Sequence, residues 1–229
     1  MPKVAGLDGC RRGWVVVTTG AALGAPCAVR RITDLGEVMG ELESGDLATV
    51  GVDIPIGLPD VGPRRCDVEA RIMVGPRRAS VFPAPLRAML GAATYEEAAG
   101  RGVALSGKSL SRQAYGILSK VGEMDRVMTP DRQDRVVEVH PEVSFTAMTG
   151  RPMAYAKRCP AGRAERLAAL RAVFPDVDGH ADGRVRGASP DDVLDAFAVA
   201  WSARRWLAGE HLRLGGDCDR RGLRMEIIA

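Results

Sequence analysis

The sequence has few aromatic residues, little net charge and no long apolar run. Aromatic residues make up 4% of the 229 positions, which argues against a surface dedicated to base stacking. The net charge of +3 is too small for a polybasic binder of nucleic acid or membranes. No apolar run approaches the ~20 residues of a spanning helix, and the first residues lack the regions of a signal peptide. We therefore expect a cytoplasmic protein with no membrane partner.

The cysteine pattern excludes two further classes of protein. The chain has five cysteines, an odd number, and none of them forms a C-x-x-C pair. This argues against a disulfide framework and a zinc knuckle, and for a reducing compartment. The basic residues are 28 Arg and 4 Lys, a bias that genome base composition also produces, so the arginine count alone is weak evidence for nucleic-acid binding.

The order of expected elements predicts an α/β fold. Short apolar or β-branched runs predict strands at residues 3–8, 14–19, 26–32, 47–54 and 134–140, and a short closing strand at 222–228. Helical spacing and capping residues predict helices at about 34–45, 111–128, 141–148, 163–174 and 190–207. Three hairpin-linked strands followed by alternating helices and strands match a ribonuclease H-like core, a mixed five-stranded sheet with flanking helices.

The length favours one domain over residues 1–229, with an insertion after the fourth strand. Residues 55–110 contain six prolines and several turn-forming glycines, so we expect an irregular functional insertion or cap there. Between residues 64 and 87 this segment carries six arginines and two acids, a local charge of +4 that leaves −1 for the rest of the chain.

Two aspartates are expected at the ends of neighbouring strands. Asp8 ends the first strand and Asp53 ends the fourth, so both would face the edge where ligands of α/β sheets bind. Asp8 with Gly9 could instead only form a turn, but a carboxylate at Asp53 in a buried strand end is costly without a partner.

The last long helix adds further carboxylates. Asp192 and Asp195 lie on one face of this helix, near its start. Capping and the helix dipole would explain Asp191 and Asp192 without any site, whereas they explain Asp195 less well. Clustered carboxylates repel each other, so a cation would be expected among them. Their oxygen atoms suit Mg²⁺ or Mn²⁺, which can stabilise both oxygens exchanged in phosphodiester cleavage.

Several motifs together resemble one family. The segments VAGLDGCRRGWVV, VGVDIPIGLPD, RRASVFPAP, VVEVHPEVSF, SPDDVLDAFAVAW and GLRMEI are similar, in this order, to the predicted RNase H-like nucleases (domain of unknown function 429). The resemblance covers nearly the whole chain and implies a ribonuclease H-like fold and a predicted nuclease activity.

The stretch from Asp192 to Ala198 also resembles the last helix of Holliday-junction resolvases, where an acid is followed by x-x-Asp-Ala and small apolar residues. This resemblance implies metal ligation by Asp192 and Asp195, and it favours Asp192 over Asp191. Resolvases commonly have Glu at the place of Asp53, so the shorter side chain changes the expected metal geometry.

The fifth strand offers two more candidates. Glu138 could complete the carboxylate cluster, and His140 could orient a water molecule or move a proton. His140 could equally serve only to cap the helix that begins at Pro141. Ser80 is a poor candidate for a covalent nucleophile, because no positioned base is evident.

The insertion supplies candidate phosphate-binding cations. These are Arg64, Arg65, Arg78, Arg87 and, just beyond the insertion, Lys120. A solvated helix face with internal ion pairs, such as Arg65 with Glu69 or Asp67 with Arg71, is the alternative explanation.

Three functions follow from these patterns. The first is a metal-dependent nuclease or phosphodiesterase with catalytic Asp8, Asp53, Asp192, Asp195 and Glu138, the four aspartates also binding the metal. The second is an ATP-dependent phosphotransfer enzyme of the actin-like superfamily, which normally needs two cores where this chain has room for one. The third is a non-catalytic module that binds nucleic acid or protein. DNA against RNA, and a monomer against a homodimer, stay open.

Overall fold

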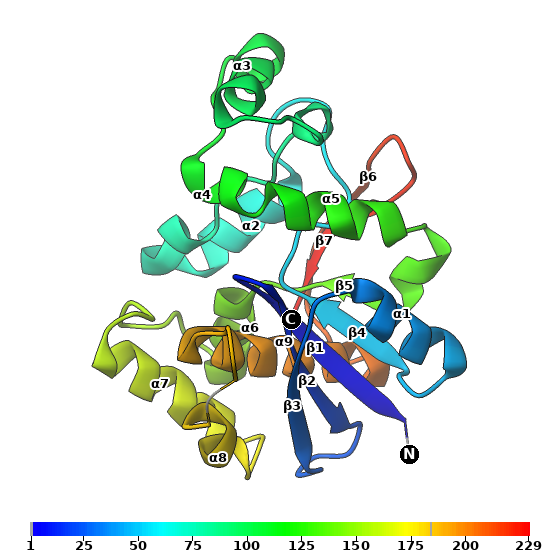
Figure 1. Ribbon diagram of the computed structural model, residues 1–229. Coiled ribbons are helices and arrows are strands. Elements are labelled where there is room, and N and C mark those ends of the chain that lie inside the picture. Colours follow the sequence, from blue (N-terminus) through cyan, green and yellow to red (C-terminus); the bar gives the residue numbers. More distant parts are fainter. Residues whose placement is uncertain (1, 184) are drawn as a thin grey trace.

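The computed structural model of the protein describes residues 2–183 and 185–229. Five strands form its central sheet, in the order β3-β2-β1-β4-β5 (Figure 1). They are β1 (Lys3–Cys10), β2 (Gly13–Gly20), β3 (Cys27–Ile32), β4 (Thr49–Val52) and β5 (Val136–Glu138). The pairs β1–β2 and β2–β3 are antiparallel, whereas β1–β4 and β4–β5 are parallel. The predicted ribonuclease H-like arrangement, a mixed five-stranded sheet with flanking helices, is confirmed.

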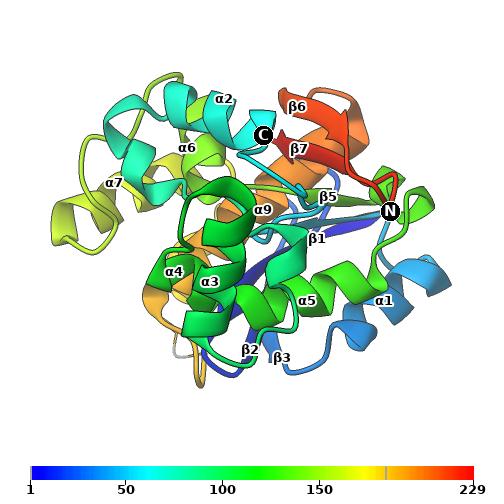
Figure 2. The same cartoon turned by 90° about the horizontal axis from the view of Figure 1, so that it is seen from above.

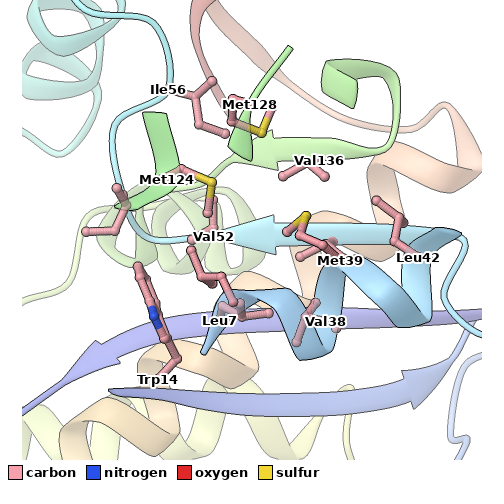
Figure 3. Close-up of a cluster of buried hydrophobic side chains, with 14 of the residues drawn as sticks. Leu7, Trp14, Val38, Met39, Leu42, Val52, Ile56, Met124, Met128 and Val136 are labelled. Carbon is pink, nitrogen blue, oxygen red and sulfur yellow. The ribbon is translucent and has the colours of Figure 1, made fainter. Parts of the chain in front are cut away.

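Helices cover both faces of this sheet (Figure 2). One face carries α1 (Leu35–Ser44) and α5 (Leu118–Val127), and the other carries α6 (Pro141–Thr149), α7 (Pro160–Arg171), α8 (Val177–Ala181) and α9 (Pro190–Ala208). Successive side chains of β2 point to opposite faces of the sheet, so Val16 packs in the core on the first face and Val15 packs in the core on the second. In Figure 3, Met124 of α5 and Val38 of α1 lie in the same cluster as Leu7 of β1.

The helix ends follow the capping residues expected from the sequence. Asp34 caps α1 through a bond from Gly36 N, and Gly45 ends that helix in the left-handed conformation. Ser189 caps α9 and forms a reciprocal capping box with Asp192. Ser111 caps α4 (Arg112–Gly116), but the helix predicted over 111–128 is interrupted before α5 begins at Leu118. Gly116 marks this break, and glycine is a weak helix former.

The segment between β4 and β5 is more regular than predicted. It contains α2 (Arg65–Met73), α3 (Tyr95–Ser106), α4 and α5, and the 3₁₀ turns η1 (Gly75–Ser80), η2 (Arg87–Met89) and η3 (Asp131–Asp134). The expectation of an irregular stretch over 55–110 is therefore wrong for α2 and α3. The prolines before and between these helices made both helices hard to predict. Helix α3 also has only two buried residues, so the sequence shows only a weak apolar pattern there.

The chain ends in a hairpin. The expected closing strand is present as β7 (Arg224–Ile228), and it pairs with β6 (Arg213–Cys218), which the sequence pattern did not predict. Gly215 and Gly216 have positive φ and break the alternation in β6, which explains why its pattern is weak. A parallel bridge from Val139 to Ile228 ties the hairpin to the end of β5. Within the described residues, no helix is long and apolar enough to cross a membrane.

Candidate functional site

Three of the predicted aspartates line one cavity. Asp8 lies on β1, Asp53 directly follows β4, and Asp195 lies in the second turn of α9. The cavity has a volume of about 680 Å³, and Asp8 and Asp195 are only 7% and 3% exposed. Because β1 and β4 are parallel neighbours, their carboxyl ends meet at the edge that α9 also reaches. The predicted convergence of carboxylates from distant parts of the sequence therefore holds for these three.

Glycine allows α9 to approach the sheet closely enough to bring Asp195 there. A Cβ atom on Gly6 of β1 would lie 2.2 Å from the backbone nitrogen of Ala200 and 2.3 Å from the carbonyl oxygen of Ala196. Any larger side chain at position 6 would therefore push the helix away. The N–H of Asp53 donates to the carbonyl oxygen of Leu7 at 2.9 Å, which extends the β1–β4 ladder up to the site.

Burial and mutual repulsion raise the pKa values of Asp8 and Asp53. Burial is the largest cause that raises the pKa of Asp8 well above its ordinary value, followed by the charges of Asp53 and Asp195. Burial and then Asp195 raise the pKa of Asp53 to about 7. Carboxylates with raised pKa values in a cavity are typical of functional sites, although ion-pair networks produce them too.

Among the described residues, Lys157 is the cation that forms an ion pair with this cluster, and sequence reasoning missed it. Its Nζ atom lies 2.5 Å from Oδ2 of Asp195. Burial opposes the charge of this ammonium group, but Asp195, then Asp53 and Asp8, raise its pKa above the ordinary value. Lys157 follows α6 in a connection without regular structure. Only its rarity, as one of 4 lysines, could have drawn attention to it.

Asp192 is employed mainly as a helix cap. Its Oδ2 accepts a hydrogen bond from the N–H of Ser189 at 2.7 Å, and its own N–H donates to the Ser189 hydroxyl. It lines a neighbouring groove rather than the cavity that holds Asp8. Its charge still contributes to the raised pKa of Asp8. The capping explanation therefore accounts for Asp192, while its assignment to catalysis and metal binding stays a prediction.

Glu138 and Arg64 form a buried ion pair. Arg64 lies 2.6 Å from Oε1 of Glu138 and 2.6 Å from Oδ1 of Asp67, and its side chain is 1% exposed. The same guanidinium donates to the carbonyl oxygens of Ile56 and Gly57, at 3.1 and 3.2 Å. Arg64 thereby fixes the segment that follows Asp53. Both Arg64 and Glu138 line the cavity, but their hydrogen-bonding groups are already occupied by each other and by neighbouring groups.

The other predicted phosphate-binding cations lie outside this cavity. Arg87 is buried between Asp125 and Asp219, Arg65 pairs with Glu69 at the surface, and Arg78 is exposed. Lys120 donates to the carbonyl oxygen of Gly13 at 2.7 Å and lies over the Trp14 ring. The ion pair of Arg65 with Glu69 was expected. The pair of Asp67 with Arg71 is not formed, because Asp67 binds Arg64 and Arg71 binds backbone carbonyls.

Two other arginines line the cavity instead. Arg77 of η1 and Arg158, next to Lys157, both border it. Among the described residues, neither arginine forms an ion pair with a carboxylate. Arg77 belonged to the basic segment noted in the sequence, but nothing in the pattern distinguished it from Arg78. Arg158 lies outside that segment, and no sequence pattern marked it as a candidate site residue.

His140 and Glu142 complete this wall of the cavity. The Nδ1 atom of His140 accepts from the N–H of Glu142 at 3.2 Å, so the predicted capping of α6 is confirmed. Burial lowers the pKa of His140, which favours the neutral ring. Glu142 is 6% exposed and pairs with buried Arg166 through Oε1. Its other carboxylate oxygen, Oε2, is buried without a hydrogen-bond partner among the described residues.

Residues 102–109 match the phosphate-loop pattern G-x-x-x-x-G-K-[ST]. The structure gives this stretch a different context. Residues 102–106 belong to α3, and Gly102 packs against Met89 rather than opening a loop after a strand. Residues 107–109 follow the end of that helix and do not line the cavity. The pattern therefore lacks the strand, loop and helix start that a phosphate loop requires.

The carboxylates fit a divalent cation by donor chemistry, although they do not form a preformed cage. Within the described part of the chain, no group of three or more His, Cys, Asp or Glu side chains is arranged so that it could hold a metal ion. Lys157 occupies one oxygen of Asp195 instead. Beside Lys157, burial and then the charges of neighbouring carboxylates still raise the pKa values of Asp8 and Asp53, so Lys157 does not fully offset the repulsion in the cluster. Oxygen donors in such a cluster are those that Mg²⁺ and Mn²⁺ prefer.

Comparisons with known proteins address the fold and the family. Two solved structures that resemble the chain are T. thermophilus RuvC in complex with a Holliday junction substrate and Thermus thermophilus RuvC, each 14% identical. The match to the first structure covers 92% of this chain and 98% of the RuvC chain, with a TM-score of 0.38. The second covers 91% and 97%, with a TM-score of 0.35. No curated protein matches the chain significantly. The family DUF429, described as "Protein of unknown function", matches residues 6–220, so the chain belongs to the DUF429 family.

Proposed function

We propose that this protein is a phosphodiester hydrolase that acts on a nucleic-acid backbone with bound Mg²⁺ or Mn²⁺. The observation that carries this proposal is the meeting of Asp8, Asp53 and Asp195 in a cavity that Arg77 and Arg158 also line. Carboxylates clustered in one cavity offer the oxygen donors that a divalent cation prefers. Arginines beside them that form no ion pair with a carboxylate among the described residues attract a phosphate. Together these groups suit a phosphate ester, because the carboxylates would bind the cation and the arginines would bind the phosphate.

Asp8, Asp53 and Asp195 would hold the cation. When bound, the cation would act as a Lewis acid and offset the charge that develops on the leaving oxygen. Lys157 would leave Asp195 for the phosphate as the carboxylates become neutralised by the cation. Arg77 and Arg158 would orient the phosphate diester. Asp192 would add negative charge near Asp8, in keeping with its effect on the pKa of that residue. Glu138 would act as a positioning residue through Arg64.

A non-catalytic binding module is the competing proposal, and one observation favours it. The ion pair of Lys157 with Asp195 already supplies a positive charge to the cluster. If this pair is permanent, the carboxylates need no metal, and the cavity would bind a ligand without cleaving it. The two proposals differ in whether cleavage depends on the carboxylates and on added metal.

The test is cleavage of labelled single-stranded, duplex and branched DNA and of RNA, with Mg²⁺ or Mn²⁺ and with a chelator. Asp8→Asn and Asp53→Asn are purified in the same way as the wild type. Asp60→Asn is the matched control, because Asp60 is an exposed aspartate outside the cavity. We expect the first two variants to lose roughly 100-fold or more of the activity and the control to keep it. Equal activity in all four proteins, or activity in the chelator, would contradict the proposal.

A further inference from the structure

We propose that the cavity beside the carboxylates binds a single nucleotide unit, with its phosphate at Arg77 and Arg158 and an N–H or O–H group of its nucleoside at Glu142. This inference rests on the proposed function, because it names the unit of substrate that the same site receives. The unit is either a free nucleotide or one nucleotide of a single strand, and both share the same chemistry.

The size of the cavity sets the first limit. Its volume of about 680 Å³ is in the range of small-molecule sites. Elements of the segment between β4 and β5 border it, including η1 with Arg77 and the junction of α4 and α5 at Ile117. Enzymes whose pocket receives a single base take that nucleotide out of the base stack. A nucleotide within an intact duplex is therefore excluded from the cavity.

Glu142 supplies the second observation, a buried acceptor that lacks a donor. The side chain is 6% exposed and lies in the first turn of α6, bordering the cavity. Arg166 holds one carboxylate oxygen, so the group stays in place while Oε2 has no partner among the described residues. A buried polar atom without a hydrogen bond costs free energy, which a donor from a bound ligand would recover. The hydroxyl groups of a ribose and the amino groups of a base are such donors.

Arg77 supplies the third observation, a donor without an acceptor. Its Nε atom is buried and has no hydrogen-bond partner in the described residues. Ser80 donates from its hydroxyl to the carbonyl oxygen of Arg77 at 2.7 Å, which fixes the turn that carries this side chain. Arg71 on the preceding helix is different, since it binds the carbonyl oxygens of Arg78 and Val81. A guanidinium group left free at the cavity suits a phosphate.

The cavity also has apolar lining. Ile54, Phe82 and Ile117 border it from three different parts of the chain. A base has an apolar face that can stack on such side chains, and Phe82 is the aromatic hydrocarbon ring among them. The cavity thus offers cations for a phosphate, an acceptor for a polar hydrogen and an apolar wall for a ring. A nucleotide contains all three complementary parts, whereas inorganic phosphate contains only the first.

Calorimetry with the full chain in a chelator tests this inference without any cleavage. The probes are AMP, adenosine and inorganic phosphate. We expect AMP to bind at least ~10-fold more tightly than either of the other two, since each supplies only part of the contacts. Equal affinity for AMP and phosphate, or no binding of AMP, would overturn the inference. Loss of cleavage in Asp8→Asn would still support the proposed function in that case, so the two failures are distinguishable.

Variants locate the bound nucleotide. Arg77→Gln should weaken AMP binding about 10-fold, because Arg158 still contacts the phosphate, whereas Arg78→Gln, the exposed neighbour outside the cavity, should leave it unchanged. Glu142→Gln should weaken AMP about 10-fold and leave phosphate unaffected. Circular dichroism checks its fold, because this change leaves buried Arg166 without its partner. If that variant fails to fold, the comparison of Arg77→Gln with Arg78→Gln decides the matter, and equal loss in both contradicts the inference.

Competition distinguishes the two sources of the nucleotide. A single-stranded tetranucleotide that displaces AMP supports a strand as the source. A tetranucleotide that does not displace AMP supports a free nucleotide. A covalently closed circular DNA duplex, which has neither ends nor a loop, would overturn the inference if it competed as strongly as AMP, because no nucleotide of an intact duplex is expected to enter the cavity.

Discussion

Replacement of Arg64 by Met should cost stability rather than substrate affinity. The guanidinium bridges Glu138 and Asp67 and donates to the carbonyl oxygens of Ile56 and Gly57. Its side chain is 1% exposed, and those of its two acidic partners are 6% and 3% exposed. Removal of the cation would leave two carboxylates buried and unpaired. Methionine is apolar and fills much of the same volume, so the lost charge dominates the effect.

The expected magnitude follows from that burial. Breaking a buried ion pair from one side typically costs about 3–5 kcal/mol. For a chain of this length each kcal/mol lowers the melting temperature by about 2–4 °C, so we expect a decrease of roughly 10 °C. Arg65→Met is the matched control, because Arg65 is the next residue and its side chain is 56% exposed. Its surface pairs should contribute at most ~1 kcal/mol.

Thermal and urea unfolding of both variants, with KM for a cleaved substrate, test this reasoning. We expect Arg64→Met to melt far below Arg65→Met. If the two variants melt together and Arg64→Met instead raises KM alone, then Arg64 binds substrate and the buried network described above does not stabilise the fold.

Three further predictions concern the site. The pKa of Asp53 is about 7 in the folded protein and 3.8 in the unfolded chain, so the free energy of unfolding should fall as pH rises between these values. With a chelator present, Asp53→Asn should make the melting temperature fall less over this pH range. An equal fall in the wild type and the variant would contradict the raised pKa of Asp53. Lys157→Met removes the ammonium group bound to Asp195, so Mn²⁺ should bind about 10-fold more tightly in calorimetry. Weaker Mn²⁺ binding would contradict a competition between Lys157 and the metal for Asp195. Gly6→Ala should destabilise the protein by about 3 kcal/mol through its clash with α9, while Gly40→Ala, in open space on α1, should raise the unfolding free energy by up to ~1 kcal/mol.

The sheet and its helix ends could be predicted because their signals are local. Ser189 before Pro190 marks the start of α9 by capping chemistry alone, and the apolar run that contains β4 is typical of a strand buried on both faces. Strand order then follows from chain connectivity. Asp8 and Asp53 could be placed at one edge for this reason, since each directly follows the last residue of the parallel β1–β4 pairing, although β1 itself continues past the predicted end at Asp8 to Cys10.

The partners of charged side chains could not be predicted in the same way. Arg64 and Arg77 belong to the same basic segment and both border the cavity, yet Arg64 is enclosed by Glu138 and Asp67 while Arg77 forms no ion pair with a carboxylate among the described residues. The difference arises from contacts across more than seventy positions of sequence in the case of Glu138. Lys157 is similar, because only the folding of its connection toward α9 brings it to Asp195. Such contacts cannot be predicted from the spacing of residues in the sequence.

Titration of the wild type and Asp8→Asn with Mn²⁺ by calorimetry near neutral pH tests the central claim most directly. The claim is that the buried carboxylates bind a divalent cation in spite of the Lys157 ion pair. We predict measurable binding to the wild type and at least ~10-fold weaker binding to the variant. No binding to the wild type, or equal binding to both proteins, would contradict the claim.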